Sequence, residues 1–376
     1  LIVSMAAVSL HFEAVDMYAL PFCILPIIIR TFFDNRLATF VAIIAIVLIG
    51  FLAPNGFEFV YLEVIAAVAA IFSLATLRKR SQMLGTAVII FCTYSICYFA
   101  IAVIQEGDFS TIDWNKLAWF GISAVLTLLV YPLIFVFEKL FGFLSDVTLM
   151  ELSDTNSSLL RELATHAPGT FQHTLQVANL AEAAALEVGG DPLLVRTGSL
   201  YHDIGKMADP AFFIENQASD NNPHDDLDFK ESARIIISHV IKGIEMAKKH
   251  NLPELIIDFI RTHHGTTKTM YFLQSYRNAH PDETVDEAQF QYPGPAPYSK
   301  ETAILMMADS VEAASRSLKK HDADTIGSLV DNIIQSQADQ GQFEHADITF
   351  KDISNIKKIF KKMLMNIYHV RIEYPK

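Results

Sequence analysis

Residues 200–206 read LYHDIGK, and residues 259–264 read FIRTHH. Each stretch starts with apolar residues and contains a pair of side chains of types that bind metals, His202-Asp203 in the first and His263-His264 in the second. Three more side chains of these types lie elsewhere in the chain, namely His173, His239 and Asp309. All seven stand on or at the end of a predicted helix. The ordered series therefore predicts an all-α domain that carries a metal site.

The number and type of these side chains indicate two metals rather than one. Five imidazoles and two carboxylates exceed the four ligands of a structural zinc site, which commonly uses cysteine. They suit two ions that accept imidazole and oxygen ligands, such as iron or manganese. A carboxylate has two oxygens, whereas a neutral imidazole binds through one lone pair. Asp203, which follows His202 directly, is therefore the predicted bridge.

The surrounding sequence has helical periodicity and helix-end signals. Gly189-Gly190 is predicted to end one helix and Asp191-Pro192 to begin the next, as expected of helix termini. Only residues 367–374 show an alternation typical of a strand. The predicted helices cover residues 172–188, 193–203, 229–249, 253–264, 300–319 and 352–366.

The first 145 residues have a different composition from the rest. They hold seven Lys or Arg and nine Asp or Glu, whereas the remainder holds 22 and 33, together with 12 of the 13 histidines. A membrane-spanning helix needs about 20 mostly apolar residues. The chain offers five such segments and part of a sixth, at residues 15–33, 37–53, 58–77, 83–104, 115–141 and 1–12. A purely soluble protein, a disordered chain and a basic nucleic-acid binder are excluded.

These segments predict the domain organisation and the orientation in the membrane. We expect a polytopic helical membrane domain at residues 1–141, a connector at 142–158 and a helical domain at 159–376. Pro132 is predicted to kink the last span. The loops that hold Arg30, Arg36 and residues 78–80 are basic, and the alternate loops are acidic. Because basic loops face the cytoplasm, the helical domain is predicted to be cytoplasmic, in a protein of the cell (inner) membrane.

The cysteines and the first residues of the chain support two further predictions. The three cysteines, Cys23, Cys92 and Cys97, all lie in apolar stretches and form no disulfide framework. The chain begins with Leu-Ile-Val inside an apolar run, so we expect sequence upstream of it.

The ordered series matches the pattern of the HD superfamily of metal-dependent phosphohydrolases, H…HD…H…HH…D. Residues 150–376 resemble the cytoplasmic domain of the seven-transmembrane HD family, which are membrane-bound cyclic di-AMP phosphodiesterases of the PgpH type. The preceding spans resemble the membrane domain of that family. The resemblance rests on HAPGTFQHT (166–174), LYHDIGKMADPAFFIENQ (200–217), NPHDDL (222–227), ISHVIKGIEMAK (237–248), FIRTHHGTT (259–267), YPGPAPYSKETAILMMADSVEAASRSL (292–318) and DITFKDI (347–353).

The resemblance implies a ligand set, a reaction and partners. One metal would be held by His173, His202, Asp203 and Asp309, and the other by Asp203, His239, His263 and His264. The two metals would hydrolyse cyclic di-AMP to linear pApA. Lys206 would offset charge on a phosphate oxygen, and Arg316 is a second candidate for phosphate contact. The expected partners are cyclic di-AMP and a lipid bilayer, with no nucleic acid polymer. A homodimer is left open.

Other functions fit the sequence less well. HD enzymes that cleave cyclic di-GMP carry a Gly-Tyr-Pro element after the histidine pair, whereas HHGTTKTMYF stands here at 263–272. Hydrolases of nucleoside polyphosphates usually have a shorter ligand series. A receptor that binds nucleotide without turnover would be expected to lack one or more ligands. A transporter is disfavoured because its spans would carry charged residues or paired broken helices.

Overall fold

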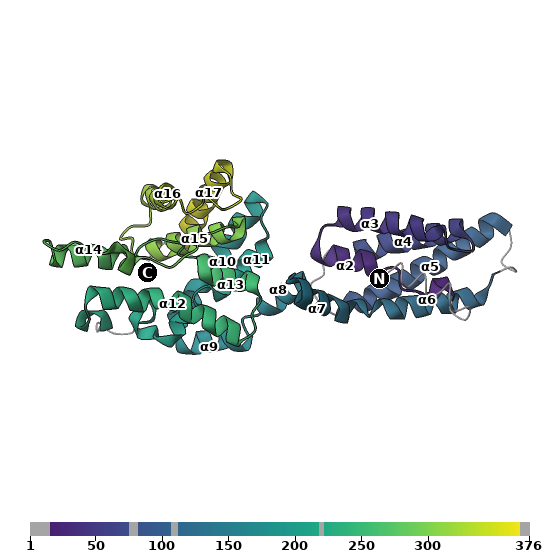
Figure 1. Ribbon diagram of the computed structural model, residues 1–376. Helices are drawn as coiled ribbons and strands as arrows, with labels where there is room; N and C mark the ends of the chain where they lie inside the picture. Colours follow the sequence, from purple (N-terminus) through teal and green to yellow (C-terminus); the bar gives the residue numbers. More distant parts are fainter. Residues whose placement is uncertain (1–15, 75–81, 107–111, 218–221, 369–376) are drawn as a thin grey trace, which may run out of the picture. The chain divides into compact units, whose positions relative to one another are not determined.

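The computed structural model describes residues 16–74, 82–106, 112–217 and 222–368. The chain divides into two compact units, a first unit of Leu1–Thr148 and a second unit of Leu149–Lys376. The described residues form helices and turns, and their one β-type pairing is an isolated bridge between Lys268 and Gln291 (Figure 1). This is the all-α class expected from the sequence.

The first unit is a bundle of apolar helices. In sequence order, α3 packs on α4, α4 on α5 and α5 on α6, while α2 contacts α3, α4 and α7. Part of the orientation argument falls outside the described residues, namely the basic residues 78–80 and two residues of the acidic loops, Glu13 and Asp108, and so does the partial span at 1–12. The elements are η1 (Met17–Ala19), α2 (Ile24–Phe32), α3 (Asn35–Gly50), α4 (Gly56–Ser73), α5 (Gln82–Glu106), α6 (Trp114–Thr127) and α7 (Val130–Phe141).

Three stretches of helix are long and apolar enough to cross a membrane. They cover Gly56–Ser73, Gln82–Ile104 and Trp114–Phe141, and two shorter apolar helical stretches precede them. The last stretch is interrupted at Leu128–Leu129, between α6 and α7. Pro132 has no N–H to offer the carbonyl of Leu128, which instead accepts from Tyr131 at 3.2 Å. The predicted kink therefore takes the form of a break one turn before the proline.

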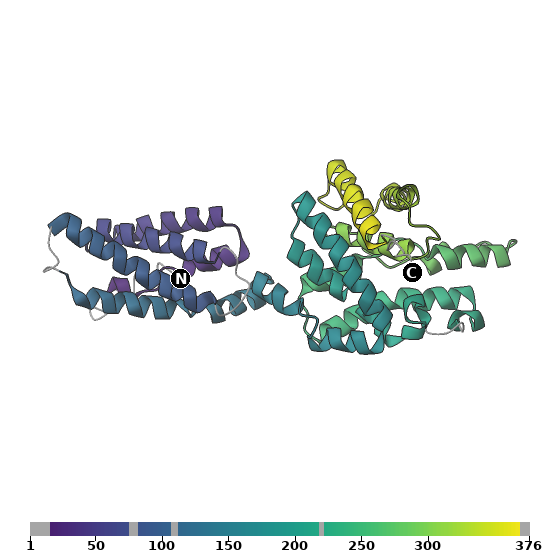
Figure 2. The same ribbon diagram turned by 180° about the vertical axis from the view of Figure 1, so that it is seen from behind.

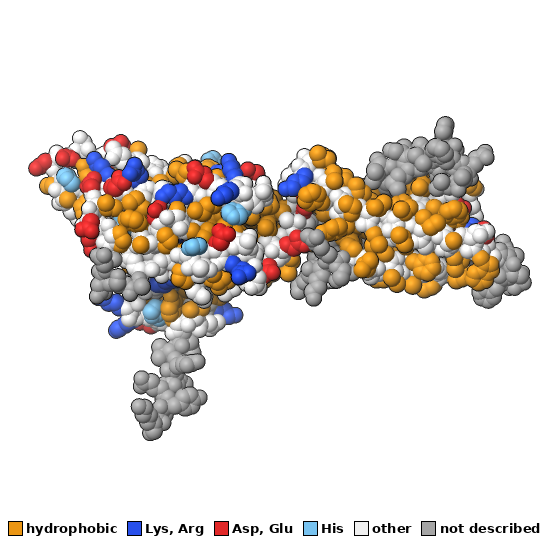
Figure 3. All heavy atoms as spheres, turned by 90° about the horizontal axis from the view of Figure 1, so that it is seen from below, with side chains coloured by type: hydrophobic (Ala, Val, Ile, Leu, Met, Phe, Trp, Pro, Cys, Tyr) orange, Lys and Arg blue, Asp and Glu red, His pale blue; other side chains and the backbone are white. Residues whose placement is uncertain are grey.

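The surface of the first unit is apolar, as a lipid-facing surface requires. Large hydrophobic side chains are exposed on several helices, among them Phe40, Phe57, Phe72, Ile96 and Val125. Figure 3 shows hydrophobic side chains over most of the visible face of this unit, whereas charged side chains gather on the second unit.

Polar groups inside the first unit are paired with one another. Lys116 Nζ lies 2.5 Å from Glu58 Oε1, which also accepts from the hydroxyl of Tyr18 at 3.2 Å. Glu63 is fully buried and accepts from the hydroxyl of Tyr94 at 2.7 Å. A buried charge or polar group destabilises the fold unless it has a partner, so these contacts join α4 to η1, α5 and α6.

The second unit is built around helices α10 and α15. Helix α10 packs against α9, α11, α15 and α17, and α15 also contacts α13 and α16 (Figures 1 and 2). Helix α8 (Asp146–Leu152) crosses the division between the units. The α-helices that follow are α9 (Ser158–His166), α10 (Pro168–Val188), α11 (Pro192–Tyr201), α12 (Phe229–Lys249), α13 (Glu254–Thr262), α14 (Met270–Ala279), α15 (Lys300–Ser315), α16 (Ala323–Asp339) and α17 (Phe350–Ile367).

Short 3₁₀ helices connect α11 to α12 and α14 to α15. The first connection follows the HD pair and contains η2 (Ile204–Ala208), η3 (Pro210–Phe212), η4 (Ile214–Asn216) and η5 (Pro223–Asp226), and the second contains η6 (Glu287–Phe290). The predicted helix ends are confirmed: Gly189 adopts a left-handed conformation after α10, and Asp191 caps α11 through its side chain. The alternating segment 367–374 falls almost entirely outside the described residues.

Two glycines let neighbouring helices approach closely enough to form the site. A Cβ on Gly205, in η2, would lie 1.9 Å from the backbone oxygen of His239, in α12. A Cβ on Gly198, in α11, would lie 2.3 Å from the ring of Phe259, in α13. Both distances are far below a van der Waals contact, so only glycine fits. These approaches draw the HD pair toward the helices that carry the other histidines.

The substitution Gly205→Ala should separate η2 from α12, because the backbone of His239 cannot yield as a flexible side chain would. We expect a loss of about 2 kcal/mol or more in the free energy of unfolding, which corresponds to a fall of about 4–8 °C in Tm for a unit of this size. Thermal unfolding of the whole chain in detergent measures this fall in Tm.

Gly327→Ala is the matched control. Gly327 lies in α16 and has nothing within 4 Å of an added Cβ. Alanine should stabilise this half-buried helical position, which has room for a Cβ, by about 0.5–1 kcal/mol. Equal Tm values for the two variants would contradict the argument from close packing.

Candidate metal centre

The seven predicted ligands meet in the second unit although they come from five different segments. His173 lies within α10, His239 within α12 and Asp309 within α15. His202-Asp203 follows α11, and His263-His264 follows α13. They form two groups, and within each group the ligand atoms all lie within 4.8 Å of one another. The first group is His173, His202, Asp203 and Asp309, and the second group is His239, His263 and His264.

The carboxylate of Asp203 lies between the two groups. Its Oδ2 is 3.6 Å from His173 Nε2 and 3.3 Å from His202 Nε2, in the first group. Its Oδ1 is 3.3 Å from His239 Nε2 and 3.6 Å from His263 Nε2, in the second group. Each oxygen therefore faces one group, which is the arrangement that a bridging carboxylate needs.

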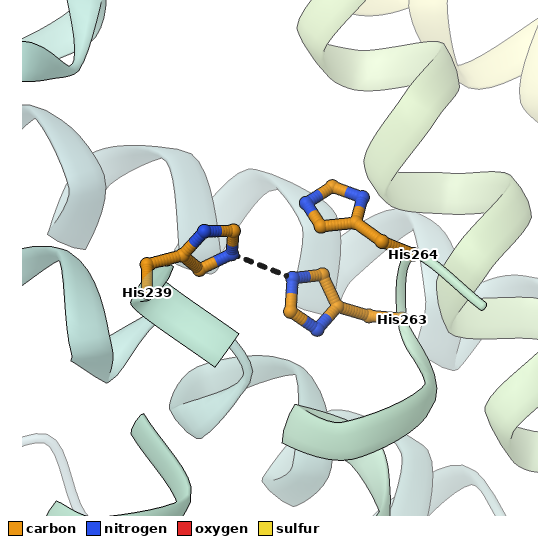
Figure 4. Close-up of side chains that lie close together, drawn as sticks. All are labelled: His239, His263 and His264. Atoms are coloured by element: carbon orange, nitrogen blue, oxygen red, sulfur yellow. Dashed lines mark hydrogen bonds between the residues drawn. The ribbon is translucent and has the colours of Figure 1, made fainter. Parts of the chain in front are cut away.

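The second group is held by contacts between aromatic rings. His239 and His263 approach each other through their Nε2 atoms at 3.1 Å (Figure 4). The ring of Tyr292 stacks on His264 with centroids 4.2 Å apart, and the rings of Phe213 and His239 form a T-shaped contact with centroids 5.7 Å apart. The three imidazoles thus have defined orientations before any ligand binds.

Hydrogen bonds at Nδ1 determine which nitrogen of each imidazole faces the centre. Nδ1 of His202, His239 and His263 lies 2.7, 2.5 and 2.8 Å from the backbone oxygen three residues earlier. A carbonyl oxygen can only accept, so Nδ1 carries a proton in each of the three, and Nε2 is the nitrogen that faces the centre. His264 differs, because its Nδ1 faces Asp309 Oδ2 at 3.9 Å.

The two groups differ in their charge. Burial opposes ionisation of His202, but the Asp203 carboxylate outweighs burial and raises the pKa of His202 to about 10. Burial lowers the pKa of His264 to about 3 and, with the neighbouring imidazoles, holds the pKa of His263 well below its usual value. Without a metal, the first group therefore holds positive charge on its imidazoles, whereas His263 and His264 of the second group are neutral.

The acidic residues of the centre stay ionised. Burial alone would raise the pKa of Asp203, yet Lys206 and His202 hold it well below the usual range. Burial likewise opposes ionisation of Asp309, but the hydrogen bond from His173 and the positive charge of His202 hold the pKa of Asp309 well below its usual value. Two carboxylates are thus buried in the charged form, which requires positive charge beside them.

These residues fit divalent metals. Among the described residues, neither oxygen of Asp203 nor Nε2 of His202 receives or makes a hydrogen bond, although all three atoms are buried. Such orphaned atoms are uncommon in folded proteins and call for an explanation. Oxygen and imidazole donors, with no thiolate among them, suit iron or manganese.

Lys206 lies in the centre and Arg316 lies beside it. The ammonium of Lys206 is 2.7 Å from Asp203 Oδ2, without hydrogen-bond geometry, and donates to Glu215 Oε1 at 2.9 Å. Burial opposes its charge, but Asp203 and Glu215 raise the pKa of Lys206 above its usual value. Arg316 binds Glu312 instead, through Nη2 at 2.6 Å. The phosphate contacts expected of Lys206 and Arg316 stay predictions.

The sequence argument missed three residues that touch the centre. Glu312 lies 2.5 Å from Nδ1 of His173, Glu215 binds Lys206, and Tyr292 stacks on His264. Only Glu312 had a signal in the sequence, because it follows Asp309 by three residues and so shares its helix face. Glu215 and Tyr292 come from irregular segments whose path no periodicity predicts.

An aromatic pocket adjoins the centre. It has a volume of about 690 Å³ and shares Phe213 and Glu215 with the surroundings of His239 and Lys206. Phe212 and Phe213 both line this pocket, and Phe213 is buried whereas Phe212 is half-buried. The other walls of the pocket include Tyr271, Phe272, His224 and the polar side chains Gln217, Asn222 and Asp225.

Comparison with known proteins accounts for both units. Residues 1–145 match the family model of a 7TM receptor with intracellular HD hydrolase, and residues 170–314 match the HD domain. The chain belongs to the seven-transmembrane HD family. Members of this family combine a multi-pass membrane domain with an intracellular HD domain, which agrees with the three membrane-crossing stretches and the helical second unit.

Several relatives carry a functional name. The chain is 36% identical over its full length to the cyclic-di-AMP phosphodiesterase PgpH of Bacillus subtilis and 42% identical over 73% of its length to that of Listeria monocytogenes. It spans 54% and 37% of the length of these relatives. A crystal structure of the Listeria monocytogenes PgpH HD domain in complex with cyclic-di-AMP is also similar to this chain, with a TM-score of 0.54 and 44% sequence identity. The match covers 57% of this chain and 99% of the crystallised chain.

Replacing the shared carboxylate should affect both groups. We expect Asp203→Asn to weaken the binding of both metals by more than the roughly 10–100-fold that loss of an outer partner causes. His239→Gln should weaken only the metal of the second group. Metal content per chain, measured after dialysis at a fixed free Mn²⁺ concentration, tests this. Equal metal content in the wild type and in Asp203→Asn would contradict the bridging role.

Proposed function

We propose that this chain is a membrane-bound phosphodiesterase that hydrolyses cyclic di-AMP to linear pApA at the metal centre of its second unit. One observation carries the proposal: the buried carboxylate of Asp203 has one oxygen toward each of two groups of imidazole ligands. The names of the relatives, and the bound cyclic di-AMP in one of them, support the substrate. The second unit is proposed to face the cytoplasm from the cell membrane.

The ligands would divide between two divalent ions, manganese or iron. His173, His202 and Asp309 would hold one ion, His239, His263 and His264 the other, and Asp203 both. When bound, such ions supply an activated water and stabilise charge on phosphate oxygens. In the overall reaction the oxygen of water bonds to phosphorus, one P–O3′ bond breaks, and the O3′ leaves with a proton as a hydroxyl group.

Lys206 is proposed to bind a non-bridging phosphate oxygen. Its ammonium is buried beside Asp203, so it points to the same space as the imidazoles. Preorganised donors of this kind stabilise charge that develops in the transition state, and in a site shielded from water they act more strongly than at a surface. The pairing with Glu215 directs the ammonium before the substrate arrives.

The aromatic pocket is proposed to receive one adenine base. Bases stack on aromatic side chains, and the amides of asparagine and glutamine pair with the N6 and N7 edge of adenine. Phe272 and Tyr271 offer rings, and Asn222 and Gln217 offer amides, on the walls of this pocket. Because Phe213 lies both in the pocket and against His239, a base in the pocket would place its phosphate near the centre.

Turnover by the whole chain in detergent tests the proposal. With Mn²⁺ or Fe²⁺ present, we expect conversion of cyclic di-AMP to pApA that a chelator abolishes and that is faster than for cyclic di-GMP. If the chain binds two metals and cyclic di-AMP but hydrolyses neither dinucleotide, a receptor without turnover replaces the proposal. Faster cleavage of cyclic di-GMP would reassign the substrate.

Lys206→Met should lower kcat by roughly 100–1,000-fold, the usual effect of removing one preorganised donor. Lys242→Met is the matched control, because Lys242 also pairs with an aspartate of the second unit, Asp209, but is more than one-third exposed. We expect wild-type kcat for the control. Initial rates at saturating cyclic di-AMP measure both, and equal rates for the two variants would rule out the role of Lys206.

Tyr271→Ala should raise KM for cyclic di-AMP roughly 5–150-fold, because stacking contributes about 1–3 kcal/mol per base. Tyr271 is 75% exposed, so its loss should leave the fold intact. Phe350→Ala, at an aromatic that is 90% exposed and outside the pocket lining, is the control. An unchanged KM in Tyr271→Ala would exclude Tyr271 from base binding.

A further inference from the structure

Helix α15 contacts both nitrogens of the His173 imidazole. Asp309 Oδ1 lies 2.8 Å from Nε2, on the side of the metal centre. Glu312 Oε2 lies 2.5 Å from Nδ1, on the opposite side of the ring. Asp309 and Glu312 are three residues apart and therefore project from the same face of α15. Both carboxylates are buried, with exposed fractions of 5% and 4%.

His173 differs in this respect from three of the other histidines of the centre. Nδ1 of His202, His239 and His263 bonds to a backbone oxygen three residues earlier in the same segment. That acceptor is part of the local backbone and no substitution removes it. Nδ1 of His173 instead depends on a side chain 139 positions away in the sequence. The orientation of this one ligand is therefore decided by the packing of α15 against α10.

Arg316 orients the Glu312 carboxylate. Its Nε and Nη2 both donate to Oε1 of Glu312, at 2.8 and 2.6 Å. This leaves Oε2 free to accept the proton of His173 Nδ1. Arg316 and Glu312 are four residues apart on α15, so the pair forms within one turn of the helix. The contacts run from the half-exposed guanidinium to the imidazole and on to the metal centre.

We propose that Glu312 is a positioning residue that holds a proton on Nδ1 of His173, so that Nε2 is the nitrogen that faces Asp203 and Asp309 and is available to a metal, with Arg316 holding Glu312 in place. The inference rests on the metal centre of the proposed function. Carboxylates in this position behind a histidine ligand orient the ring and make it a stronger donor, and their loss typically lowers metal affinity 10–100-fold. Glu312 is thereby assigned to the metal of the first group alone.

The test is Mn²⁺ binding to the whole chain in detergent, followed by competition with a chelator and by electron paramagnetic resonance. Wild type should bind two coupled Mn²⁺ ions. Glu312→Ala should bind one of them about 10–100-fold more weakly, and at intermediate Mn²⁺ its spectrum should change from that of a coupled pair to that of a single ion. Glu312→Gln retains an oxygen that accepts from Nδ1, so its affinity should fall less than that of the alanine variant.

Controls separate this role from a general effect on folding. Glu182→Ala removes a glutamate that pairs with Arg196 in the same unit and contacts none of the described ligands, and it should bind Mn²⁺ as wild type does. If Glu312→Ala does not fold, as judged by circular dichroism in chelator, Arg316→Met is the substitute. Its side chain is 37% exposed, and it should lower Mn²⁺ affinity at one site only.

Two outcomes would overturn the inference. One is wild-type affinity for both ions in Glu312→Ala, and the other is an equal loss in the glutamine and alanine variants, since the first retains the acceptor. Failure of the proposed function looks different: a wild-type chain that binds two Mn²⁺ ions but does not cleave cyclic di-AMP leaves the role of Glu312 intact.

Discussion

The buried carboxylate of Asp203 is the constraint on which the second unit depends. A buried ionised carboxylate destabilises a fold by several kcal/mol unless positive charge and hydrogen bonds lie beside it. Lys206 supplies one charge, His202 and His173 supply more in the metal-free chain, and divalent ions would supply it in the loaded chain. The helices must therefore approach Asp203 closely from several sides. Gly205 and Gly198 make that approach sterically feasible, which explains why a glycine follows so soon after the HD pair.

Local charge would let an acidic protein bind the anionic dinucleotide of the proposed function. The chain has a formal net charge of −13, and a cyclic dinucleotide carries two negative phosphates. The field at the centre is determined by nearby groups rather than by net charge, because exposed charges beyond a Debye length of about 8–10 Å are screened. Divalent metals, when bound, and the ammonium of Lys206 would be the largest local charges there. The aromatic pocket beside them adds apolar surface for a base without adding negative charge to the phosphate site.

The first unit is also stabilised by contacts between buried polar side chains, but its outer surface is apolar. Its stability therefore cannot come from burying hydrophobic side chains away from water as in the second unit. Specific packing and polar contacts between helices matter more, and Glu58 with Lys116 and Glu63 with Tyr94 provide them. The break before Pro132 falls within the last stretch, shortly before the chain continues toward the second unit.

The sequence by itself determined the class of both units, the ends of several helices and the seven residues that meet at the centre. These follow from local chemistry: periodicity, capping residues, and histidines and aspartates whose order matches a known series. Tertiary structure alone decided that one oxygen of Asp203 faces each group, that Arg316 binds Glu312 and that Tyr292 stacks on His264. Each of these depends on how segments far apart in the sequence pack. A residue pattern states which side chains share a helix face, but not which atom of a neighbouring helix they meet.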